Sequence, residues 1–404
     1  MRQALVVAIG DEVLSGNTVN GNGAHIAHKL GEIGLKVVEQ RVIPDQRSAI
    51  KQTLADALKT HDLVIATGGL GPTMDDNTRR SVAELLGCPL RYDEEVARRL
   101  AERYGDVDVG IKDQATIPAL AKPLHNVVGT APGLLFEQER SVLILLPGVP
   151  VEMRSLLERE VLPYLQKRFP VGQREAVESL HFFQVRELEV DALMRKLAPD
   201  YPEVRFGIYP SLGVVHLRLY HPASAAALLP LKQVFQEAFQ GRLFTSSDGT
   251  LEGAIHEQFV AKQITLATAE SCTGGTIASH LTARPGASDY FLGSVVAYSN
   301  RVKNRLLGVS EGVLEKHGAV SEETVRAMVL GLLDRVGSDY GIAVSGIAGP
   351  TGGAPEKPVG TVWIAVGKRG EEPVTSLLNA RGDRAAIITR SLYYALGELL
   401  KRVR

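Results

Sequence analysis

The sequence predicts an α/β protein with a doubly wound N-terminal sheet, a small α+β segment and a second α/β domain. Over residues 1–170, short apolar runs alternate with stretches of helical periodicity. Over 175–246, shorter strand and helix signals are separated by turn residues. From residue 249 onward, strand-like runs again end in glycine-rich loops. A chain of 404 residues can bury the cores of two or three such domains.

Composition excludes several classes of protein. The net charge is −1, so no overall basic field favours nucleic acid or an anionic membrane. Two cysteines, Cys88 and Cys272, cannot form a disulfide framework or a cysteine-rich zinc site. The N-terminus lacks a secretory signal pattern, and no uncharged apolar run reaches membrane-spanning length. We therefore expect a cytoplasmic protein without a membrane segment.

The first domain begins with a continuous apolar run, which is typical of a strand buried on both faces of a parallel sheet. The expected elements, in order, are a strand over 4–9, a helix over 20–31, a strand over 36–43, a helix over 47–60 and a strand over 62–66. Ligands of such sheets bind at the carboxyl ends of the strands. Two loops lie there, Gly10-Asp11-Glu12 and the glycine-rich turn from Thr67 to Thr78.

The glycine-rich turn is the more informative of the two loops. Backbone amides at Gly68, Gly69 and Gly71 can approach a phosphate. The adjacent carboxylates Asp75 and Asp76 suit Mg²⁺, which binds one or two carboxylates together with substrate phosphate oxygens. A plain turn, with Asp75 or Asp76 capping the following helix, is the alternative.

A small segment follows a linker at residues 169–175. It shows two helices on three strands and resembles a KH-like unit; the strands are expected at 179–185, 204–209 and 213–220, and the helices at 188–197 and 223–240. A KH module that binds nucleic acid needs a Gly-x-x-Gly clamp, and none occurs between residues 180 and 240. We therefore expect a spacer or dimerisation domain within a homodimer, and we do not expect nucleic acid as a partner.

Ser271 occupies a strand-to-helix turn. The apolar run 264–269 precedes it, Gly274 and Gly275 follow it, and a helix is expected from Thr276. A hydroxyl beside unpaired helix N-terminal amides can be a nucleophile, with the amides from Thr273 to Gly275 as an oxyanion hole. The alternative is an ordinary N-cap.

Lys303 is the candidate base for this serine. It follows the strand-like run 293–299 near Tyr298. Desolvation or a neighbouring cation can lower the pKa of a lysine far enough for it to accept a proton. Tyr298 is expected to share that proton or to orient the lysine. In the alternative reading, Lys303 is a solvated helix residue and Tyr298 belongs to the core.

Two further segments are expected to bind the substrate. The loop 346–353 follows a strand, and its candidate ligand-facing residues are Gly346, Gly349, Thr351 and Gly352. Arg381 and Arg384 flank the start of a long amphipathic helix, a position that suits phosphate. Arg384 is the stronger candidate for the phosphate contact, because it is closer to the first helical turn. A surface salt bridge with Asp383 is the alternative for these arginines.

These C-terminal motifs, Ala269–Gly275, Tyr298–Asn300 with Lys303, Gly346–Gly353 and Lys357–Val362, resemble the CinA C-terminal amidohydrolase family. The resemblance implies deamidation of nicotinamide mononucleotide (NMN) to nicotinic acid mononucleotide and ammonia. We expect a Ser271/Lys303 mechanism without a metal cofactor. Cys272 is the competing nucleophile, because thiols attack more readily than hydroxyls.

The first domain, including 126–133 and 142–153, resembles the molybdopterin-binding-like N-terminal domain of CinA proteins. That resemblance implies a metal-dependent ADP-ribose pyrophosphatase. Asp11, Glu12, Asp75 and Asp76 are then the potential ligands of a divalent cation such as Mg²⁺, Mn²⁺ or Co²⁺.

The combined expectation is an enzyme of pyridine nucleotide recycling that acts on small nucleotides. Its domains are expected at 1–170, 175–246 and 249–404. The competing hypothesis is a non-catalytic nucleotide- or pterin-binding accessory protein in competence or the DNA damage response.

Overall fold

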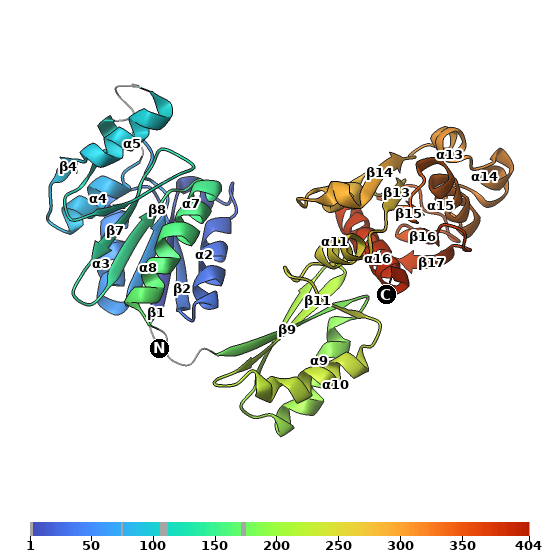
Figure 1. Cartoon of the computed structure of the whole chain (residues 1–404), viewed down its shortest axis with the longest axis horizontal. Coiled ribbons are helices and arrows are strands. Elements are labelled where there is room, and N and C mark those ends of the chain that lie inside the picture. The colour runs from blue at the N-terminus through green and yellow to red at the C-terminus, as the bar shows by residue number, and fades with distance from the viewer. Residues whose placement is uncertain (1–2, 74–75, 106–111, 171–174, 404) are drawn as a thin grey trace. The chain divides into compact units, whose positions relative to one another are not determined.

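The computed structural model describes residues 3–73, 76–105, 112–170 and 175–403. Its internal contacts divide the chain into two compact units, Met1–Arg174 and Glu175–Arg404. Each unit is built from sheets covered by helices (Figure 1). No described helix combines the length and the apolar character needed to cross a membrane.

The first unit contains a six-stranded sheet in the order β2-β1-β3-β8-β7-β6. The first four strands in this order pair in parallel and the last two antiparallel. The strands are β1 (Gln3–Ile9), β2 (Lys36–Ile43), β3 (Leu63–Thr67), β6 (Lys122–Leu124), β7 (Gly133–Glu137) and β8 (Val142–Leu146), with a separate pair β4 (Leu90–Tyr92) and β5 (Thr116–Pro118).

Helices cover both faces of this sheet, as expected for a doubly wound fold. Successive residues of β1 point to opposite faces, so Val6 packs with α2 and α7 while Val7 packs with α3 and α4. The helices are α1 (Asp11–Leu14), α2 (Gly21–Glu32), α3 (Arg47–Thr60), α4 (Thr78–Leu85), α5 (Glu94–Tyr104), α7 (Pro150–Leu156) and α8 (Leu162–Arg168).

The second unit starts with a middle subdomain, residues 175–246. Its elements are β9 (Ala176–Phe183), α9 (Glu187–Leu197), β10 (Arg205–Ser211), β11 (Val214–His221), α10 (Leu229–Ala238) and β12 (Leu243–Phe244). The sheet is antiparallel throughout, in the order β10-β11-β9-β12. The sequence pattern missed β12, because a strand of two residues has no periodicity to read. With this fourth strand, the subdomain has the β-α-β-β-α-β order of a split βαβ fold.

The C-terminal subdomain, residues 249–403, has a five-stranded sheet in the order β14-β13-β15-β16-β17. Strand β13 lies parallel to both of its neighbours, and β16 and β17 are antiparallel. The strands are β13 (Leu266–Glu270), β14 (Phe291–Val296), β15 (Tyr340–Gly346), β16 (Thr361–Lys368) and β17 (Val374–Asn379). The helices are α11 (Leu251–Lys262), α12 (Thr276–Thr282), α13 (Asn300–Leu307), α14 (Glu311–His317), α15 (Glu322–Val336) and α16 (Arg384–Val403).

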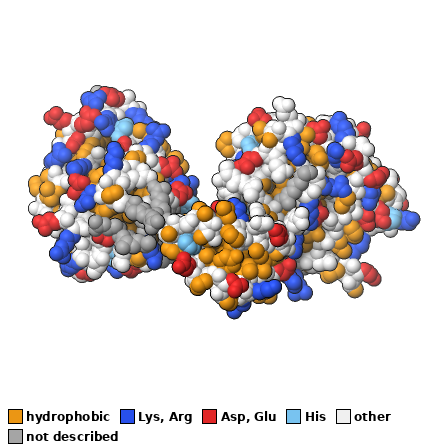
Figure 2. Space-filling model, turned by 60° about the horizontal axis from the view of Figure 1, so that its bottom comes forward, with side chains coloured by type: hydrophobic (Ala, Val, Ile, Leu, Met, Phe, Trp, Pro, Cys, Tyr) orange, Lys and Arg blue, Asp and Glu red, His pale blue; other side chains and the backbone are white. Residues whose placement is uncertain are grey.

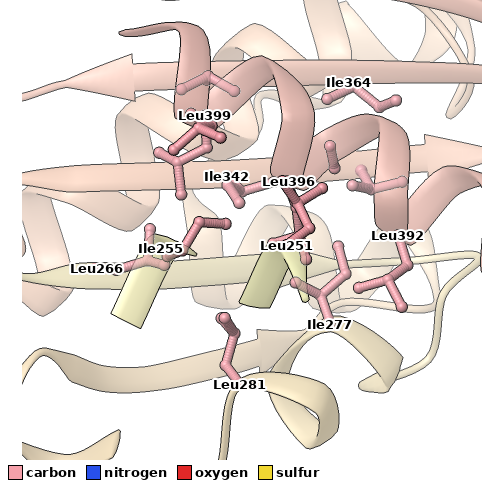
Figure 3. Packing of buried hydrophobic residues seen from close by; sticks show 14 of the residues in the cluster. Leu251, Ile255, Leu266, Ile277, Leu281, Ile342, Ile364, Leu392, Leu396 and Leu399 are labelled. Atoms are coloured by element: carbon pink, nitrogen blue, oxygen red, sulfur yellow. The ribbon is translucent and has the colours of Figure 1, made fainter. Parts of the chain in front are cut away.

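The core on one face of this sheet combines residues from α11, α12 and α16 (Figure 3). Leu251, Leu396 and Ile277 come from these three helices and meet Ile342 of β15. Helices α13 and α15 pack on the opposite face. The Ser271 turn, between β13 and α12, is therefore supported from both sides by packed helices.

The middle subdomain shares this core. Phe183, Val214 and Phe244, at one end of its sheet, are buried in the same cluster as Leu396 and Leu400 of α16. The Gln184 side chain donates to the carbonyl of Tyr394 and to Glu398. The segments expected as a connector and a separate C-terminal domain therefore belong to one compact unit.

The close approach of Gly397 to Phe183 yields a prediction. A Cβ at position 397 would lie 2.6 Å from a ring carbon of buried Phe183, so Gly397→Ala should lower the free energy of unfolding by roughly 1–3 kcal/mol. Gly312→Ala, in helix α14 with open space around it, is the matched control and should stabilise by up to about 1 kcal/mol. Urea unfolding followed by fluorescence of Trp363, the single tryptophan, reports on this unit. Equal stability of both variants would show that the two subdomains are not tightly docked.

Candidate active site

Ser271 lies in a tight turn at the carboxyl end of β13. The turn is closed by hydrogen bonds from Gly274 N–H to the Ser271 carbonyl and from Thr276 N–H to the Thr273 carbonyl. Gly274 and Gly275 have φ angles of 60° and 98°, which explains why glycines follow the serine. Ser271 N–H donates to Val344 of the neighbouring β15 at 2.9 Å, which ties the turn to the sheet.

Lys303 meets this serine inside the protein. Its side chain is buried, and Nζ lies 2.9 Å from Ser271 Oγ, 2.9 Å from the Ala297 carbonyl and 3.3 Å from the Tyr298 carbonyl. A neutral amine has two N–H donors and one lone pair. The two carbonyls can accept both N–H groups, which leaves the lone pair for the Ser271 hydroxyl proton.

The environment of Lys303 favours that neutral form. Burial lowers the pKa of Lys303 from its ordinary value. In the described part of the chain, no carboxylate forms an ion pair with it. The alternative reading of Lys303 as a solvated helix residue is therefore wrong, and the arrangement has the geometry of a serine nucleophile with a lysine base.

Cys272, the competing nucleophile, is buried beside this pair. Burial raises the pKa of its thiol to about 12. Because the thiolate is the reactive form, a thiol that stays protonated is a poor nucleophile. The geometry favours Ser271, which has a base within hydrogen-bonding distance.

Glu270, the last residue of β13, is a functional residue that the sequence analysis missed. Its fully buried carboxylate accepts from the N–H groups of Gly275 at 3.0 Å, Ile277 at 3.1 Å and Ala278 at 2.9 Å. These are amides of the first turn of α12 and the residue before it, which have no partner within the helix. The signal available in the sequence was an acidic residue shortly before a predicted helix, because a carboxylate is stabilised near a helix N-terminus.

This capping changes the assignment of the oxyanion hole. Of the expected donors Thr273 to Gly275, Gly274 N–H already donates to Ser271 and Gly275 N–H to Glu270. Within the described turn, the N–H groups of Cys272 and Thr273 donate to no protein oxygen. Of the three expected donors, only Thr273 therefore keeps an N–H group without a protein acceptor, and Cys272, which was not among them, is the second such residue in the turn.

Tyr298 reaches the site through its backbone. Its carbonyl accepts from Lys303, while its side chain is 60% exposed and accepts from Arg384 Nη2 at 3.0 Å. The alternative that Tyr298 belongs to the core is wrong. Of the two roles expected for Tyr298, the orientation of Lys303 falls to its main-chain carbonyl oxygen.

Arg384, the first residue of α16, joins two parts of the site. Besides Tyr298, its guanidinium binds the Gly349 carbonyl at 2.8 Å. It thereby fixes the loop that contains Gly346, Gly349, Thr351 and Gly352, which follows β15 next to the Ser271 turn. The salt bridge with Asp383, which was the alternative for these arginines, does not appear among the described contacts. Asp383 instead accepts from Ala386 N–H at the start of the helix, and Arg381 remains exposed.

In the first unit, three loops meet at the carboxyl edge of the sheet. Thr67 Oγ1 donates to the Pro147 carbonyl at 2.8 Å, and Asn22 Nδ2 donates to the Gly148 carbonyl at 2.7 Å. Gly68 has a φ of 113°, and a Cβ there would lie 2.0 Å from the Ile9 carbonyl oxygen. The glycine-rich turn with Gly68, Gly69 and Gly71 is therefore packed directly against the end of β1.

The carboxylates of this edge were expected to hold a divalent cation. Asp76 accepts from Thr73 N–H at 2.9 Å and closes the glycine-rich turn, and the N-cap of α4 is Asn77. Asp75 lies outside the described residues. Among the residues that are described, no three His, Cys, Asp or Glu side chains are grouped so as to hold a metal ion.

Asp45, after β2, is a further carboxylate of this edge that the sequence analysis missed. Its Oδ1 is buried without a hydrogen-bond partner, and it would lie 3.1 Å from a Cβ at Gly69. Burial, followed by the nearby carboxylates of Glu12, Asp11 and Asp76, raises the pKa of Asp45. An orphaned acceptor among other carboxylates fits a cation.

The cap by Glu270 yields a second prediction. Glu270→Gln replaces one accepting oxygen with an amide donor that faces backbone N–H groups, so it should lower the free energy of unfolding by roughly 1.5–3 kcal/mol. Glu311→Gln, in the exposed first turn of α14, is the control and should cost no more than about 1 kcal/mol. Urea unfolding followed by Trp363 fluorescence measures both. If Glu270→Gln is no worse than the control, the carboxylate does not hold the turn.

Comparisons with known proteins agree with both halves of this architecture. The family model of the CinA C-terminal domain matches residues 248–403, and that of a probable molybdopterin binding domain matches residues 5–167. A putative competence-damage inducible protein from Symbiobacterium thermophilum is 39% identical over 97% of each chain. A CinA-like protein from Citrifermentans bemidjiense is 37% identical over 97% of this chain and 95% of its own.

Solved structures also match. The CinA protein of unknown function from Thermoplasma acidophilum is 38% identical and covers 41% of this chain and 97% of its own, with a TM-score of 0.39. The competence damage-inducible protein A from Klebsiella pneumoniae is 38% identical and covers 38% of this chain and 94% of its own, with a TM-score of 0.37. Matches to relatives along nearly the whole chain show that this protein belongs to the CinA family.

Proposed function

We propose that the second unit is an amidohydrolase that converts NMN to nicotinic acid mononucleotide and ammonia. The observation that carries this proposal is the buried contact between Ser271 Oγ and Lys303 Nζ at 2.9 Å. A lysine whose pKa is lowered by burial and which lies against a serine hydroxyl can act with it as a nucleophile–base pair. The CinA C-terminal resemblance supplies the substrate.

The reaction follows from the positions of these groups. Ser271 Oγ attacks the carboxamide carbon while Lys303 takes its proton, and the oxyanion forms against the amides of Cys272 and Thr273. Lys303 then returns the proton to the departing nitrogen, which leaves as ammonia. Water, activated by the same amine, cleaves the acyl ester and releases the carboxylate product. This unit's own side chains perform each proton transfer.

Recognition of the nucleotide must involve its phosphate, because free nicotinamide carries the same carboxamide. Arg381 and Arg384 flank the start of α16, where phosphate binds well. Because the Arg384 guanidinium already holds Gly349 and Tyr298, we assign it the positioning of the loop beside the carboxamide. The exposed Arg381 is the better candidate for direct phosphate contact.

For the first unit, we propose hydrolysis of ADP-ribose or a similar nucleotide diphosphate with a divalent cation such as Mg²⁺, Mn²⁺ or Co²⁺. The observation that favours this activity is the unpartnered buried oxygen of Asp45 beside the glycine-rich turn. Asp45, Asp76 and Asp75 would hold the cation, with Asp11 and Glu12 nearby. When bound, the cation would neutralise charge on the phosphates. Amides of the turn would bind phosphate oxygens.

One experiment tests both activities. The full chain is incubated with NMN, and separately with ADP-ribose and a divalent cation, and the products are identified by mass spectrometry. We expect nicotinic acid mononucleotide in the first reaction, and AMP with ribose 5-phosphate in the second. If neither substrate is consumed, the competing proposal of a non-catalytic nucleotide-binding accessory protein is favoured.

The choice of nucleophile yields a third prediction. Ser271→Ala should reduce kcat for NMN by roughly 10³-fold or more, because it removes the attacking atom. Cys272→Ala should stay within a few-fold of the unchanged protein, since the protonated thiol takes no part. Ammonia release measures both. The reverse pattern would make Cys272 the nucleophile.

A fourth prediction concerns pH. Lys303 accepts a proton only when neutral, so kcat/KM should fall about tenfold per pH unit below its pKa and level off above it. Since burial lowers that pKa, the midpoint should lie below 10.5, the ordinary value for lysine. Lys303→Arg should lose activity at every pH, because arginine stays charged. A profile without an acidic limb between pH 5 and the midpoint would exclude lysine as the base.

A fifth prediction separates the two units. Asp45→Asn and Asp76→Asn should each reduce ADP-ribose hydrolysis by roughly 10²-fold or more and leave NMN deamidation unchanged. Asp56→Asn, a surface change on α3, is the matched control. EDTA should abolish the hydrolysis of ADP-ribose only. Normal rates in both carboxylate variants would show that these residues only shape the loops.

A further inference from the structure

The two faces of the middle subdomain's sheet differ in character. Leu180, Phe182, Leu217 and Leu219 point toward α9 and α10 and form the subdomain core. Because side chains alternate along a strand, their neighbours lie on the opposite face. Phe183, Val214 and Phe244 at one end of that face are covered by the C-terminal subdomain. The rest of that face lies beyond this contact.

We call this remaining part the open face; it includes Val177 and Ser179 of β9, Arg205, Gly207 and Tyr209 of β10, and His216, Arg218 and Tyr220 of β11. Strand register sets Arg205 opposite Tyr220, Arg218 opposite Ser179 and Tyr220 opposite Val177. These residues are therefore neighbours across three strands rather than scattered surface positions.

Planar groups dominate the open face. The Arg205 guanidinium lies 3.7 Å from the Tyr220 ring centroid, and that of Arg218 lies 5.4 Å from the Tyr209 centroid. The two tyrosine hydroxyls are 3.1 Å apart and join the two stacks. Gly207, between them on β10, has no side chain, and the Tyr209 ring leans over its position. The surface is therefore built largely of aromatic rings and guanidinium groups.

The open face is also accessible and cationic. Tyr209 and Val177 are 47% and 49% exposed. Arg205 pairs with Glu175 at 3.0 Å, whereas no carboxylate pairs with Arg218 in the described part of the chain. A sheet face with tyrosine rings, arginine side chains over them and a guanidinium without a described carboxylate partner complements a nucleobase next to a phosphate.

We propose that the open face binds single-stranded nucleic acid, with bases stacked on the tyrosine–arginine planes and a phosphate on Arg218. Four-stranded sheets with exposed aromatic side chains recognise single strands in this way. The missing Gly-x-x-Gly clamp, on which the expectation against nucleic acid depended, belongs to a different binding mode. Bases paired within a duplex present no free face for such stacking.

A second copy of the chain fits this face less well. Interfaces of stable homodimers are apolar at their centre, and the open face is mainly polar. Apolar side chains instead gather on the helical side of the subdomain, as Figure 2 shows, where Leu188 and Leu229 are 75% and 54% exposed. The experiment must therefore also be able to detect a protein partner on the open face.

The test is fluorescence anisotropy with the full chain and labelled single strands of DNA and RNA, each of about 12 nucleotides. Binding is measured at roughly 50 and 200 mM salt. We expect Tyr209→Ala and Tyr220→Ala each to weaken binding roughly 5- to 150-fold, the loss of one stacked base. Tyr220→Phe should retain affinity, because its ring remains. Arg218→Ala should weaken binding and reduce the salt dependence.

Arg195→Ala is the matched charge control, because Arg195 is exposed on α9 on the opposite side and pairs with Asp191. It should leave binding unchanged, and every variant should deaminate NMN as the unchanged protein does. The proposal is overturned if neither single strand binds at low salt, if an equal-length duplex competes as well as the single strands, or if Arg195→Ala weakens binding as much as Arg218→Ala. It is also overturned if the tyrosine variants alter the oligomeric state and not oligonucleotide binding, which would assign the face to a second copy.

Discussion

The buried carboxylate of Glu270 is the interaction on which the geometry of the C-terminal site depends. Burying an ionisable group is costly unless it is hydrogen-bonded, and here three backbone amides and the hydroxyl of Thr268 surround it. The carboxylate fixes the start of α12 relative to β13. It occupies the amides of Gly275, Ile277 and Ala278, whereas those of Cys272 and Thr273 donate to no protein oxygen within the described turn. The cap therefore determines which amides of the turn already have partners.

Burial then acts in opposite directions on two neighbouring groups. It lowers the pKa of the Lys303 amine and raises that of the Cys272 thiol, because in both cases the charged form is disfavoured. A neutral amine is a base, whereas a neutral thiol is a weak nucleophile. One physical effect thus favours Lys303 as a base and disfavours Cys272 as a nucleophile. The carbonyls of Ala297 and Tyr298 also orient the Lys303 amine. They can accept both of its N–H groups, which leaves its lone pair directed toward the serine.

The middle subdomain uses the two ends of one sheet face differently. At one end, apolar residues dock on α16 and complete the core of the C-terminal subdomain. At the other end, the same face is polar and planar, with tyrosines and arginines in cross-strand pairs. A simple spacer would need only the first of these features. The face therefore changes from apolar to polar along the length of its strands. This change is separate from the alternation of side chains that divides the face from the helical core.

The sequence by itself determined the α/β class, the strand-end position of the glycine-rich loops, and Ser271 and Lys303 as candidates. Each of these follows from local patterns: apolar runs, periodicity, and small residues at a turn. Only the tertiary structure decided which amides are free, that Arg384 holds Gly349 and Tyr298, that Asp45 joins the carboxylates near Gly69, and that β12 completes the middle sheet. Those features depend on groups that meet through the packing of separate elements. Local sequence patterns do not encode these contacts, because the hydrogen bonds and the burial of a side chain depend on the partner that the fold places beside it.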